Sequence, residues 1–344
     1  MTSDRPGMTP LLQLPRVRAE QSRLLRTTVG LRPYRPDGFV VRAERIGEKL
    51  VVHDYGHGGS GMTLCWGTAQ MAVELALYNL GAAAGVIGCG VIGLATARLL
   101  QRRGVKVTIY TVDEPPHTTS DVSGAFWAPF GLVDDGRLTP DIAGRVVKAA
   151  RIAHEEFERL RPDPRYAIRR LPIYYIADTE PSPGIEKELL PDLFDGPILR
   201  PGAHPWGMRE VMVVEGMCFD PTPFLEAVHE DFLREGGSIV HRKVASREDI
   251  ASLPEPVVFN CTGLGSRELA SDAELIPMKG QLNLFQAQPE IDYMIALERE
   301  RIYMMPRRDC IVVGTSKVRN DWTLTPDPNE TARVVGGIRR LYED

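Results

Sequence analysis

Six residues in the first third of the chain have the spacing of a phosphate-binding loop: Gly88-Cys89-Gly90-Val91-Ile92-Gly93. Before them, Ala83–Ile87 is small and apolar like a buried strand, and apolar residues at helical spacing follow. Gly88 and Gly90 would let the main chain turn and approach a diphosphate, while Gly93 would let the helix pack closely on the strand. The diphosphate would lie at the positive end of the helix dipole. The segment therefore predicts a site for an adenine dinucleotide.

The second strand of such a unit is expected to end near an acidic residue that binds the ribose hydroxyls. Val105–Tyr110 has the β-branched and aromatic residues of a strand, and Asp113 lies twenty residues after Gly93. Glu114 is a close alternative. The glycine pattern does not distinguish FAD from a nicotinamide cofactor, and a glycine-rich turn can also bind nothing.

A run rich in hydroxyl groups comes next: Thr118-Thr119-Ser120-Asp121-Val122-Ser123-Gly124-Ala125-Phe126-Trp127. Such a run can be no more than a helix start. Beside a diphosphate, its hydroxyl and main-chain amide groups would instead bind phosphate or ribose oxygens. Gly124 and Ala125 would let the main chain lie against a flat ring.

A second glycine-dense loop precedes the fingerprint and leads into a predicted helix, Thr63–Asn79. It contains Gly58-Gly59-Ser60-Gly61-Met62-Thr63. Main-chain N–H groups gather at such a loop, and they can stabilise negative charge that develops on a bound ring. We therefore expect Ser60–Thr63 to contact the ring of the cofactor. His57 is more readily explained as a structural histidine than as a catalytic one.

Arg32 is the strongest candidate for substrate binding. It stands in the segment Leu31-Arg32-Pro33-Tyr34-Arg35-Pro36, whose prolines stiffen the chain around it. A fixed guanidinium binds a carboxylate through two hydrogen bonds, as recognition of an amino acid requires. The alternative is a pair of surface arginines on a turn.

Together these segments resemble the D-amino-acid oxidase family of FAD-dependent amine oxidoreductases. The resemblance implies that Arg32 binds the substrate carboxylate and that the main-chain carbonyl of Gly59 accepts a hydrogen bond from the substrate amine. It also implies FAD contacts at a further set of residues in the hydroxyl-rich run, the second glycine loop and two later strands: Thr118, Thr119, Ser120, Gly124, Ala125, Phe126, Gly58, Ser60, Gly61, Met62, Thr63, Val244, Thr262 and Gly263.

The order of these segments differs from the family pattern, because the part that normally closes the chain here precedes the fingerprint. The sequence is therefore predicted to be circularly permuted, with Leu80-Gly81-Ala82 as the join. The new ends would fall between two helices that are consecutive in the family and are expected here at Arg16–Thr27 and Ala332–Tyr342. Residues 1–10 match nothing and are expected to be disordered.

The implied fold class is α/β: a Rossmann-like FAD-binding domain plus an α+β substrate domain with a mixed or antiparallel sheet. The FAD-binding domain is expected to be discontinuous, over residues 38–135 and 210–272. Residues 11–37, 136–209 and 273–344 would form the substrate and interface domain. Long helices are expected at Asp141–Leu160 and Phe224–Glu235.

Composition limits the function classes. A net charge of −5 and 43% hydrophobic residues describe an ordinary soluble chain and do not favour nucleic-acid binding. No apolar run is long enough to span a bilayer. The five cysteines have no metal-ligand spacing, so no metal site is predicted and a reducing, cytoplasmic location fits best. The expected partners are an amino-acid substrate and O₂; a homodimer is left open.

The leading hypothesis is FAD-dependent oxidation of a D-amino acid by hydride transfer from Cα to flavin N5, giving an imino acid, then a 2-oxo acid, ammonia and hydrogen peroxide. Alternatives are an oxidase or dehydrogenase of a secondary amino acid and a non-catalytic dinucleotide-binding protein. The family places a lid with tyrosines near residues 180–210, but this chain has none there. His204, Trp206 and Arg209 would either line the pocket or belong to a plain surface loop.

Overall fold

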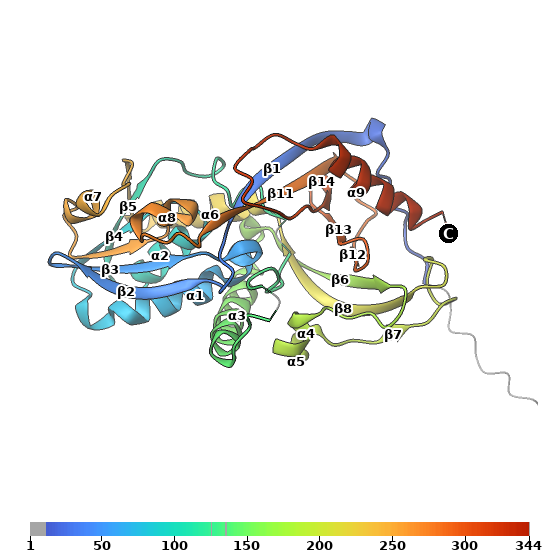
Figure 1. Ribbon diagram of the computed structural model, residues 1–344, viewed down its shortest axis with the longest axis horizontal. Coiled ribbons are helices and arrows are strands. Elements are labelled where there is room, and N and C mark those ends of the chain that lie inside the picture. The colour runs from blue at the N-terminus through green and yellow to red at the C-terminus, as the bar shows by residue number, and fades with distance from the viewer. Residues whose placement is uncertain (1–11, 125, 135, 344) are drawn as a thin grey trace, which may run out of the picture.

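The computed structural model describes residues 12–124, 126–134 and 136–343, so the predicted disordered extension 1–10 and Ala125 lie outside the described residues. Two sheets form the framework, the smaller in the left half of Figure 1 and the larger in the right half. The predicted fold class, a Rossmann-like α/β unit joined to an α+β unit with a mixed sheet, is confirmed.

The smaller sheet is the dinucleotide-type unit. Its strand order is β2 (Val40–Ile46), β3 (Lys49–Tyr55), β10 (Val257–Asn260), β4 (Ala83–Ile87), β5 (Lys106–Thr111) and β9 (Ser238–His241). The strands from β3 to β9 are parallel, and β2 pairs antiparallel with β3. Helices α1 (Gly61–Ala76) and α2 (Val91–Gln101) follow β3 and β4. Both helices therefore begin at the carboxyl edge of the parallel sheet, where ligands of this fold bind.

The larger sheet has nine strands. Along its main path the order is β1 (Leu24–Tyr34), β11 (Ile276–Gln286), β14 (Cys310–Gly314), β13 (Ile302–Pro306), β12 (Met294–Leu297), β6 (Ile168–Ala177), β8 (Glu210–Phe219) and β7 (Ile198–Leu199), while β15 (Val318–Arg319) pairs with β11. All its pairings are antiparallel except β6 with β12. Strand β8, which the predicted FAD-binding domain includes from residue 210, pairs with β6 in the larger sheet. The full division into domains stays a prediction.

Three further long helices are α3 (Pro140–Leu160), α6 (Pro221–Arg234) and α9 (Pro328–Arg340). Each has a proline in its first turn, where a missing N–H group costs little. Helix α3 lies very close to α1, as a Cβ built at Gly67 of α1 shows: it would be 1.9 Å from the carbonyl oxygen of Ala149 in α3. The short helices are α4 (Ile185–Leu189), α5 (Pro191–Phe194), α7 (Arg247–Ala251) and α8 (Ser266–Leu269), with single 3₁₀ turns at Gln21–Arg23, Gly58–Ser60, Leu77–Asn79, Pro164–Tyr166 and Gly263–Gly265.

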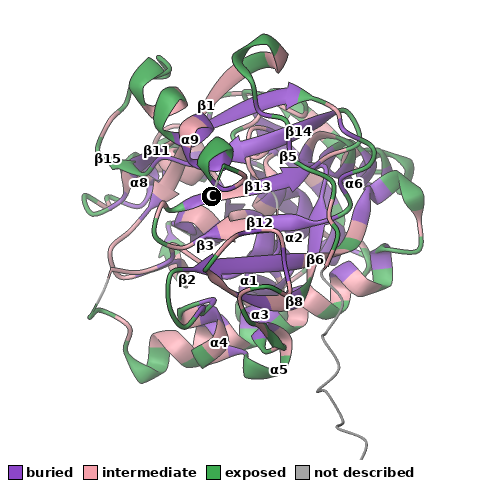
Figure 2. Cartoon of the chain, turned by 90° about the vertical axis from the view of Figure 1, so that its right-hand side faces the viewer, coloured by how far each residue is buried: buried purple, intermediate pink, exposed green. Residues whose placement is uncertain are grey.

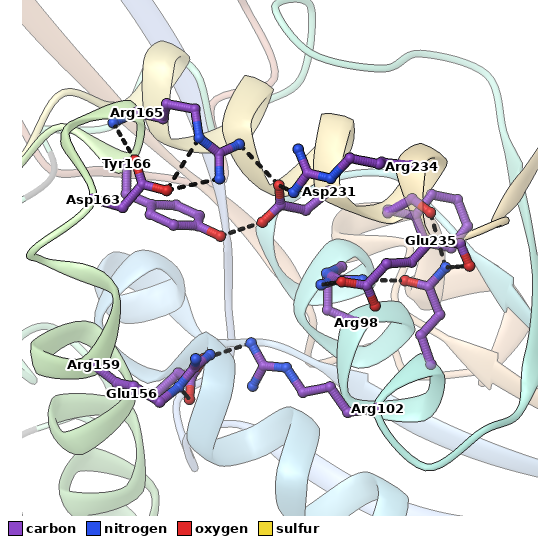
Figure 3. Close-up of polar contacts among 12 residues, drawn as sticks. Arg98, Arg102, Glu156, Arg159, Asp163, Arg165, Tyr166, Asp231, Arg234 and Glu235 are labelled. Atoms are coloured by element: carbon purple, nitrogen blue, oxygen red, sulfur yellow. Dashed lines mark hydrogen bonds and ion pairs between the residues drawn. The ribbon is translucent and has the colours of Figure 1, made fainter.

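Ion pairs connect α6 to its neighbours, as Figure 3 shows. Asp231 of α6 is buried and pairs with Arg165 at 2.9 Å, and the Tyr166 hydroxyl donates to the same carboxylate. Arg98 of α2 is also buried and pairs with Glu235 at 2.6 Å. These contacts fix the helices that cover the smaller sheet, so they stabilise the unit that carries the fingerprint.

The predicted helix Arg16–Thr27 is wrong. Residues 12–20 are irregular, a 3₁₀ turn covers Gln21–Arg23, and β1 begins at Leu24. The leucine and arginine residues of this segment suit a helix, but its β-branched residues continue into a strand that pairs with β11 down to Tyr34. Pairing with β11 therefore outweighs local helix propensity.

The two ends of the described chain lie together. The guanidinium of Arg16 lies over the ring of Tyr342 at 5.3 Å, and the Tyr293 hydroxyl contacts both Tyr342 and the carbonyl of Pro15. The predicted join at Gly81 is open, because a Cβ there would meet nothing within 4 Å. Both features are compatible with a circular permutation, which stays a prediction.

The strands and the inner faces of the helices form the core, which appears as the purple interior in Figure 2. One cluster joins the smaller sheet, α1–α3 and part of the larger sheet, and a second lies under α9. In the part of the chain that the structure describes, no helix has the length and apolar character needed to cross a membrane.

Candidate active site

A cavity of about 470 Å³ opens at the carboxyl edge of the smaller sheet and reaches the larger sheet. This volume is within the range of about 300–1,000 Å³ that ligand pockets have. Residues from β3, β4 and β5 and the residues that directly follow β10 line one part, and residues from β1, β11 and β13 line the other. The cavity thus joins the predicted dinucleotide site to the predicted substrate site.

Most of the predicted site residues line this cavity. They are Arg32, Gly58, Gly59, Gly61, Met62, Thr63, Gly88, Gly90, Val91, Ile92, Asp113, Thr118, Thr119, Ser120, Gly124, Phe126, Val244, Thr262 and Gly263. Gly93 and Ser60 do not line it, and Ala125 lies outside the described residues. Segments far apart in the sequence are therefore brought to one place, while their individual roles stay predictions.

The fingerprint glycines have the packing that the sequence predicts. A Cβ at Gly93 would lie 1.9 Å from the carbonyl oxygen of Gly88, so the first turn of α2 touches the loop. Gly88 has a φ of +101°, which favours glycine. Gly90 at the N-cap has no side chain to cap the helix, although the Ser120 hydroxyl accepts from the Val91 N–H at 3.1 Å. The arrangement suits a diphosphate at the helix N-terminus.

The structure also separates the two acidic candidates. Asp113 lines the cavity just past β5. Glu114 lies between two histidines, 2.9 Å from Nε2 of His229 and 3.3 Å from Nε2 of His241. Asp113 is thus the acidic candidate that lines the cavity, and its contact with a ribose stays a prediction. Arg242 and Lys243 line the same end of the cavity, and the sequence prediction included only their neighbour Val244.

The second glycine loop is covered by the segment 128–131. The Gly59 N–H donates to the carbonyl of Gly131 at 3.2 Å, and the Ser60 hydroxyl donates to the carbonyl of Phe130 at 2.6 Å. A Cβ at Gly58 would lie 2.5 Å from the Gly131 carbonyl oxygen, so this approach requires glycine. Ser60 therefore holds the loop from outside the cavity, and the glycines form the wall.

His57 and Asp54 form a buried pair under this loop. Nε2 of His57 lies 3.2 Å from the Asp54 carboxylate and 3.0 Å from the Thr68 hydroxyl. Its ring stacks on Phe39 at 5.6 Å. These contacts fit the structural role that the sequence favours for His57.

Arg32 lies in the wall that the larger sheet contributes. Its Nε donates to the Met278 carbonyl at 3.2 Å, and its Nη2 donates to the carbonyls of Ser316 at 2.6 Å and Lys279 at 3.4 Å. Among the described residues, none accepts a hydrogen bond from Nη1. Burial lowers the pKa of Arg32, but an arginine stays protonated in proteins. The side chain is thus a fixed positive charge with donor capacity at the cavity. Arg35 instead pairs with Asp272 at 2.7 Å and with Glu274 at 3.0 Å.

Tyr303 of β13 faces the same region and was not predicted. Its ring lies 6.2 Å from that of Phe126, and a Cβ at Gly124 would lie 2.5 Å from its hydroxyl. Burial raises the pKa of Tyr303, and the charge of Arg32 opposes that shift. The hydroxyl therefore stays protonated and able to donate. Its place in the strand pattern Ile302–Pro306 was visible, but only the fold shows that it faces Arg32.

The aromatic side chains of Phe126 and Phe130 stack on each other at 5.3 Å and complete the wall. The segment 180–210, where this chain departs from the family pattern of a lid with tyrosines, contributes no residue to the cavity. Trp206 belongs to the second core cluster, and His204 is buried with its ring 5.7 Å from that of Trp206, while Arg209 pairs with Glu300 at 3.3 Å. None of the three residues lines the cavity, and the burial of His204 and Trp206 also contradicts the alternative of a plain surface loop for these two.

FAD fits the described residues. Two helix N-termini without side-chain caps, α1 and α2, begin at the cavity, and glycines stand where a Cβ would fill it or distort its wall. One end of the cavity is lined by the acidic residue Asp113, by the hydroxyl-bearing residues 118–120 and by the cations Arg242 and Lys243. This set suits a ribose, a diphosphate and a flat ring in sequence.

Comparison with known proteins identifies the class. The family described as "FAD dependent oxidoreductase" (DAO) matches residues 84–344. The chain is 29% identical over 271 residues to a D-amino acid oxidase of Dugesia ryukyuensis, covering 74% of this chain and 76% of that protein. It is 32% identical over 251 residues to a D-amino-acid oxidase of Rubrobacter xylanophilus, covering 71% and 72%. The chain therefore belongs to the DAO family of FAD-dependent oxidoreductases.

Solved structures agree on the fold. An iminodiacetate oxidase from Chelativorans sp. BNC1 aligns with a TM-score of 0.57 at 17% identity, over 76% of this chain and 80% of that one. A glycine oxidase from Geobacillus kaustophilus aligns with a TM-score of 0.57 at 13% identity, over 77% and 79%. The predictions of the family, of an oxidoreductase and of FAD as its cofactor are thus confirmed. The family match begins within β4, at the fingerprint strand.

Proposed function

We propose that this protein oxidises a D-amino acid to the imino acid, which water hydrolyses to a 2-oxo acid and ammonia. The observation that carries the proposal is the position of Arg32, whose guanidinium is held by three carbonyls at the cavity wall. A positive charge fixed in this way suits a substrate carboxylate. The likeness to proteins described as D-amino-acid oxidases supports the choice of substrate class.

Each chain segment has a task in this proposal. Arg32 binds the carboxylate, with the Tyr303 hydroxyl as a second donor on the same side. The carbonyl of Gly59 accepts a hydrogen bond from the amine, so that Cα is held between the two contacts. Phe126 and Phe130 exclude water from the space around Cα. The contribution of these residues is orientation and electrostatics.

The electron balance is simple. The substrate loses the Cα hydrogen as hydride and one amine proton, and the C=N double bond forms. FAD, when bound, supplies the two-electron acceptor for the hydride. O₂ finally takes two electrons and two protons and leaves as hydrogen peroxide. A neutral amine needs no general base, and none of the described cavity residues is required as one.

The test is an anaerobic titration of the FAD-loaded protein with D-amino acids, L-amino acids and N-methylglycine, followed by visible absorption. We expect the flavin bands to bleach with D-amino acids. In Arg32→Ala the half-bleaching concentration should rise by about a hundredfold, as loss of a charged hydrogen-bonded pair predicts. Arg35→Ala, which removes an arginine of the same segment from outside the cavity, is the matched control. Bleaching by N-methylglycine alone, or by no amino acid, would contradict the proposal.

A further inference from the structure

A second arginine, Arg307, contacts the main chain of Ser123 and Gly124, in the hydroxyl-rich segment 118–127. It lies in the turn between β13 and β14, which its own N–H closes by donating to the Cys310 carbonyl at 2.8 Å. Its Nη2 donates to the carbonyl of Ser123 and to that of Gly124, the latter at 3.4 Å. Arg307 does not line the cavity, whereas both of its acceptor residues do.

Gly124 also packs tightly against Tyr303. A Cβ at Gly124 would lie 2.5 Å from the Tyr303 hydroxyl, so the main chain there is pressed against that side chain. Beyond it, Phe126 forms a bridge with Cys218 and the Trp127 N–H donates to the Met217 carbonyl at 2.7 Å. Strand β8 therefore holds Phe126 and Trp127, and Arg307 holds Ser123 and Gly124.

Arg307 also contributes charge. Its guanidinium acts electrostatically on Tyr303 in the same direction as Arg32 does. Its Nε atom is buried and has no hydrogen-bond partner among the described residues, so the contacts that hold the side chain there are those to the Ser123 and Gly124 carbonyls. A buried donor left in this way is costly. The arrangement is therefore unlike that of a solvated surface arginine.

We propose that Arg307 is a positioning residue that holds the main chain at Ser123 and Gly124 against Tyr303, and so fixes the wall on which the ring of FAD lies. This inference rests on the proposed function only in that it places the ring of FAD against the main chain of Ser123 and Gly124. Arginine suits this position because one planar, charged guanidinium can donate to both carbonyls.

The test compares Arg307→Met with Arg308→Met. Arg308 stands in the same turn, is exposed, and donates to the Pro164 carbonyl instead of the segment. We expect Arg307→Met to weaken FAD binding, measured by flavin fluorescence, by about tenfold or more, as loss of hydrogen bonds from a charged donor predicts. The visible band of the remaining bound flavin should lose its fine structure. Arg308→Met should leave both readouts unchanged.

Arg307→Lys provides the rescue, and it replaces Arg307→Met if that variant does not fold. Lysine keeps the charge but cannot donate to both carbonyls from a rigid fork. The FAD affinity of Arg307→Lys should therefore lie between that of wild type and that of Arg307→Met. If Arg307→Met does not fold, the expected result is an FAD affinity of Arg307→Lys below that of wild type. Wild-type FAD binding with no difference between the Arg307 and Arg308 variants would overturn this inference alone. Normal FAD binding with no bleaching by D-amino acids would overturn the proposed function alone.

Discussion

The guanidinium of Arg32 lies directly against Gly280 of the neighbouring strand: a Cβ built at Gly280 would be 2.8 Å from Nη2. The two residues come from β1 and β11, which pair from Arg26↔Leu284 to Tyr34↔Ile276 without a break in register. The absence of a side chain at Gly280 is therefore what lets the guanidinium reach its three carbonyl acceptors.

Gly280→Ala should move the guanidinium without unfolding the protein, because the displaced atoms are the end of a flexible side chain. We expect the KM for a D-amino acid to rise by about tenfold, with FAD affinity unchanged, since a misplaced charged pair costs roughly 1–2 kcal/mol. Steady-state kinetics with FAD in excess would measure it. Gly144→Ala in α3, where a Cβ meets nothing within 4 Å, is the control. An unchanged KM would contradict the role of Arg32.

Gly93→Ala should act on the cofactor instead. Its Cβ would lie 1.9 Å from the main-chain carbonyl of Gly88, which cannot move without opening the fingerprint loop. We expect FAD binding to fall below detection and the unfolding free energy to fall by about 2–3 kcal/mol, as overpacking predicts. Thermal unfolding and flavin fluorescence would check both. Gly81→Ala, at an open position, should leave the two quantities at wild-type values.

The sequence was sufficient for the parts of the site in which local geometry dictates residue type. The glycines of the fingerprint follow from a βαβ unit whose spacing is fixed, so they could be predicted directly, whereas the spacing left both Asp113 and Glu114 as acidic candidates. Tyr303 and Arg307 could not, because they act across strand pairs and turns whose neighbours depend on the whole sheet. Their residue types alone resemble ordinary strand and turn residues.

The fold was predictable in the same uneven way. Ala83–Ile87 and the long helices carry clear periodicity, and the structure has β4 at those five residues. The segment 16–27 failed because its partner β11 lies more than 240 residues away, so local propensity favoured a helix. Long-range pairing decides such segments, and a single sequence does not contain that information in a local window.

Glu186 on α4 should make stability depend on pH. Its carboxyl is buried, and burial raises its pKa to about 7. The folded state therefore holds the proton more tightly than the unfolded state does. Its stabilising effect is fully present below the unfolded pKa near 4.5 and is lost as pH rises to about 7. Between pH 5 and pH 8 the unfolding free energy should fall by roughly 2–3 kcal/mol from this group.

Glu186→Gln removes the titration while keeping the shape of the side chain. Urea unfolding at pH 5 and pH 8 should then give nearly equal free energies for this variant, apart from the contribution of other groups. Glu188→Gln changes an exposed carboxylate of the same helix and should retain the wild-type pH dependence. If Glu186→Gln and Glu188→Gln show the same loss between the two pH values, the buried carboxyl is not its source.

The contact between Arg16 and Tyr342 predicts that the chain can be re-opened elsewhere. Because the Arg16 guanidinium lies 5.3 Å from the centre of the Tyr342 ring, we expect a flexible linker to be able to join residue 343 to residue 12, and a new start can be placed at Ala82. The rearranged chain would have the fingerprint near its beginning and α1 at its end. We expect it to fold, with an FAD dissociation constant within about threefold of the parent, since chain ends at open surface positions are well tolerated.

A matched control for this rearrangement opens the chain at Gly67 instead, inside α1 where the helix touches Ala149. That version should fail to bind FAD, because the new ends fall within packed structure. Equal FAD binding by both versions would show that the protein tolerates new chain ends at either place, so that the result for Ala82 would give no support to a join at residues 80–82. Failure of the Ala82 version alone would contradict the view that residues 80–82 connect two segments that were once separate ends, and with it the predicted permutation.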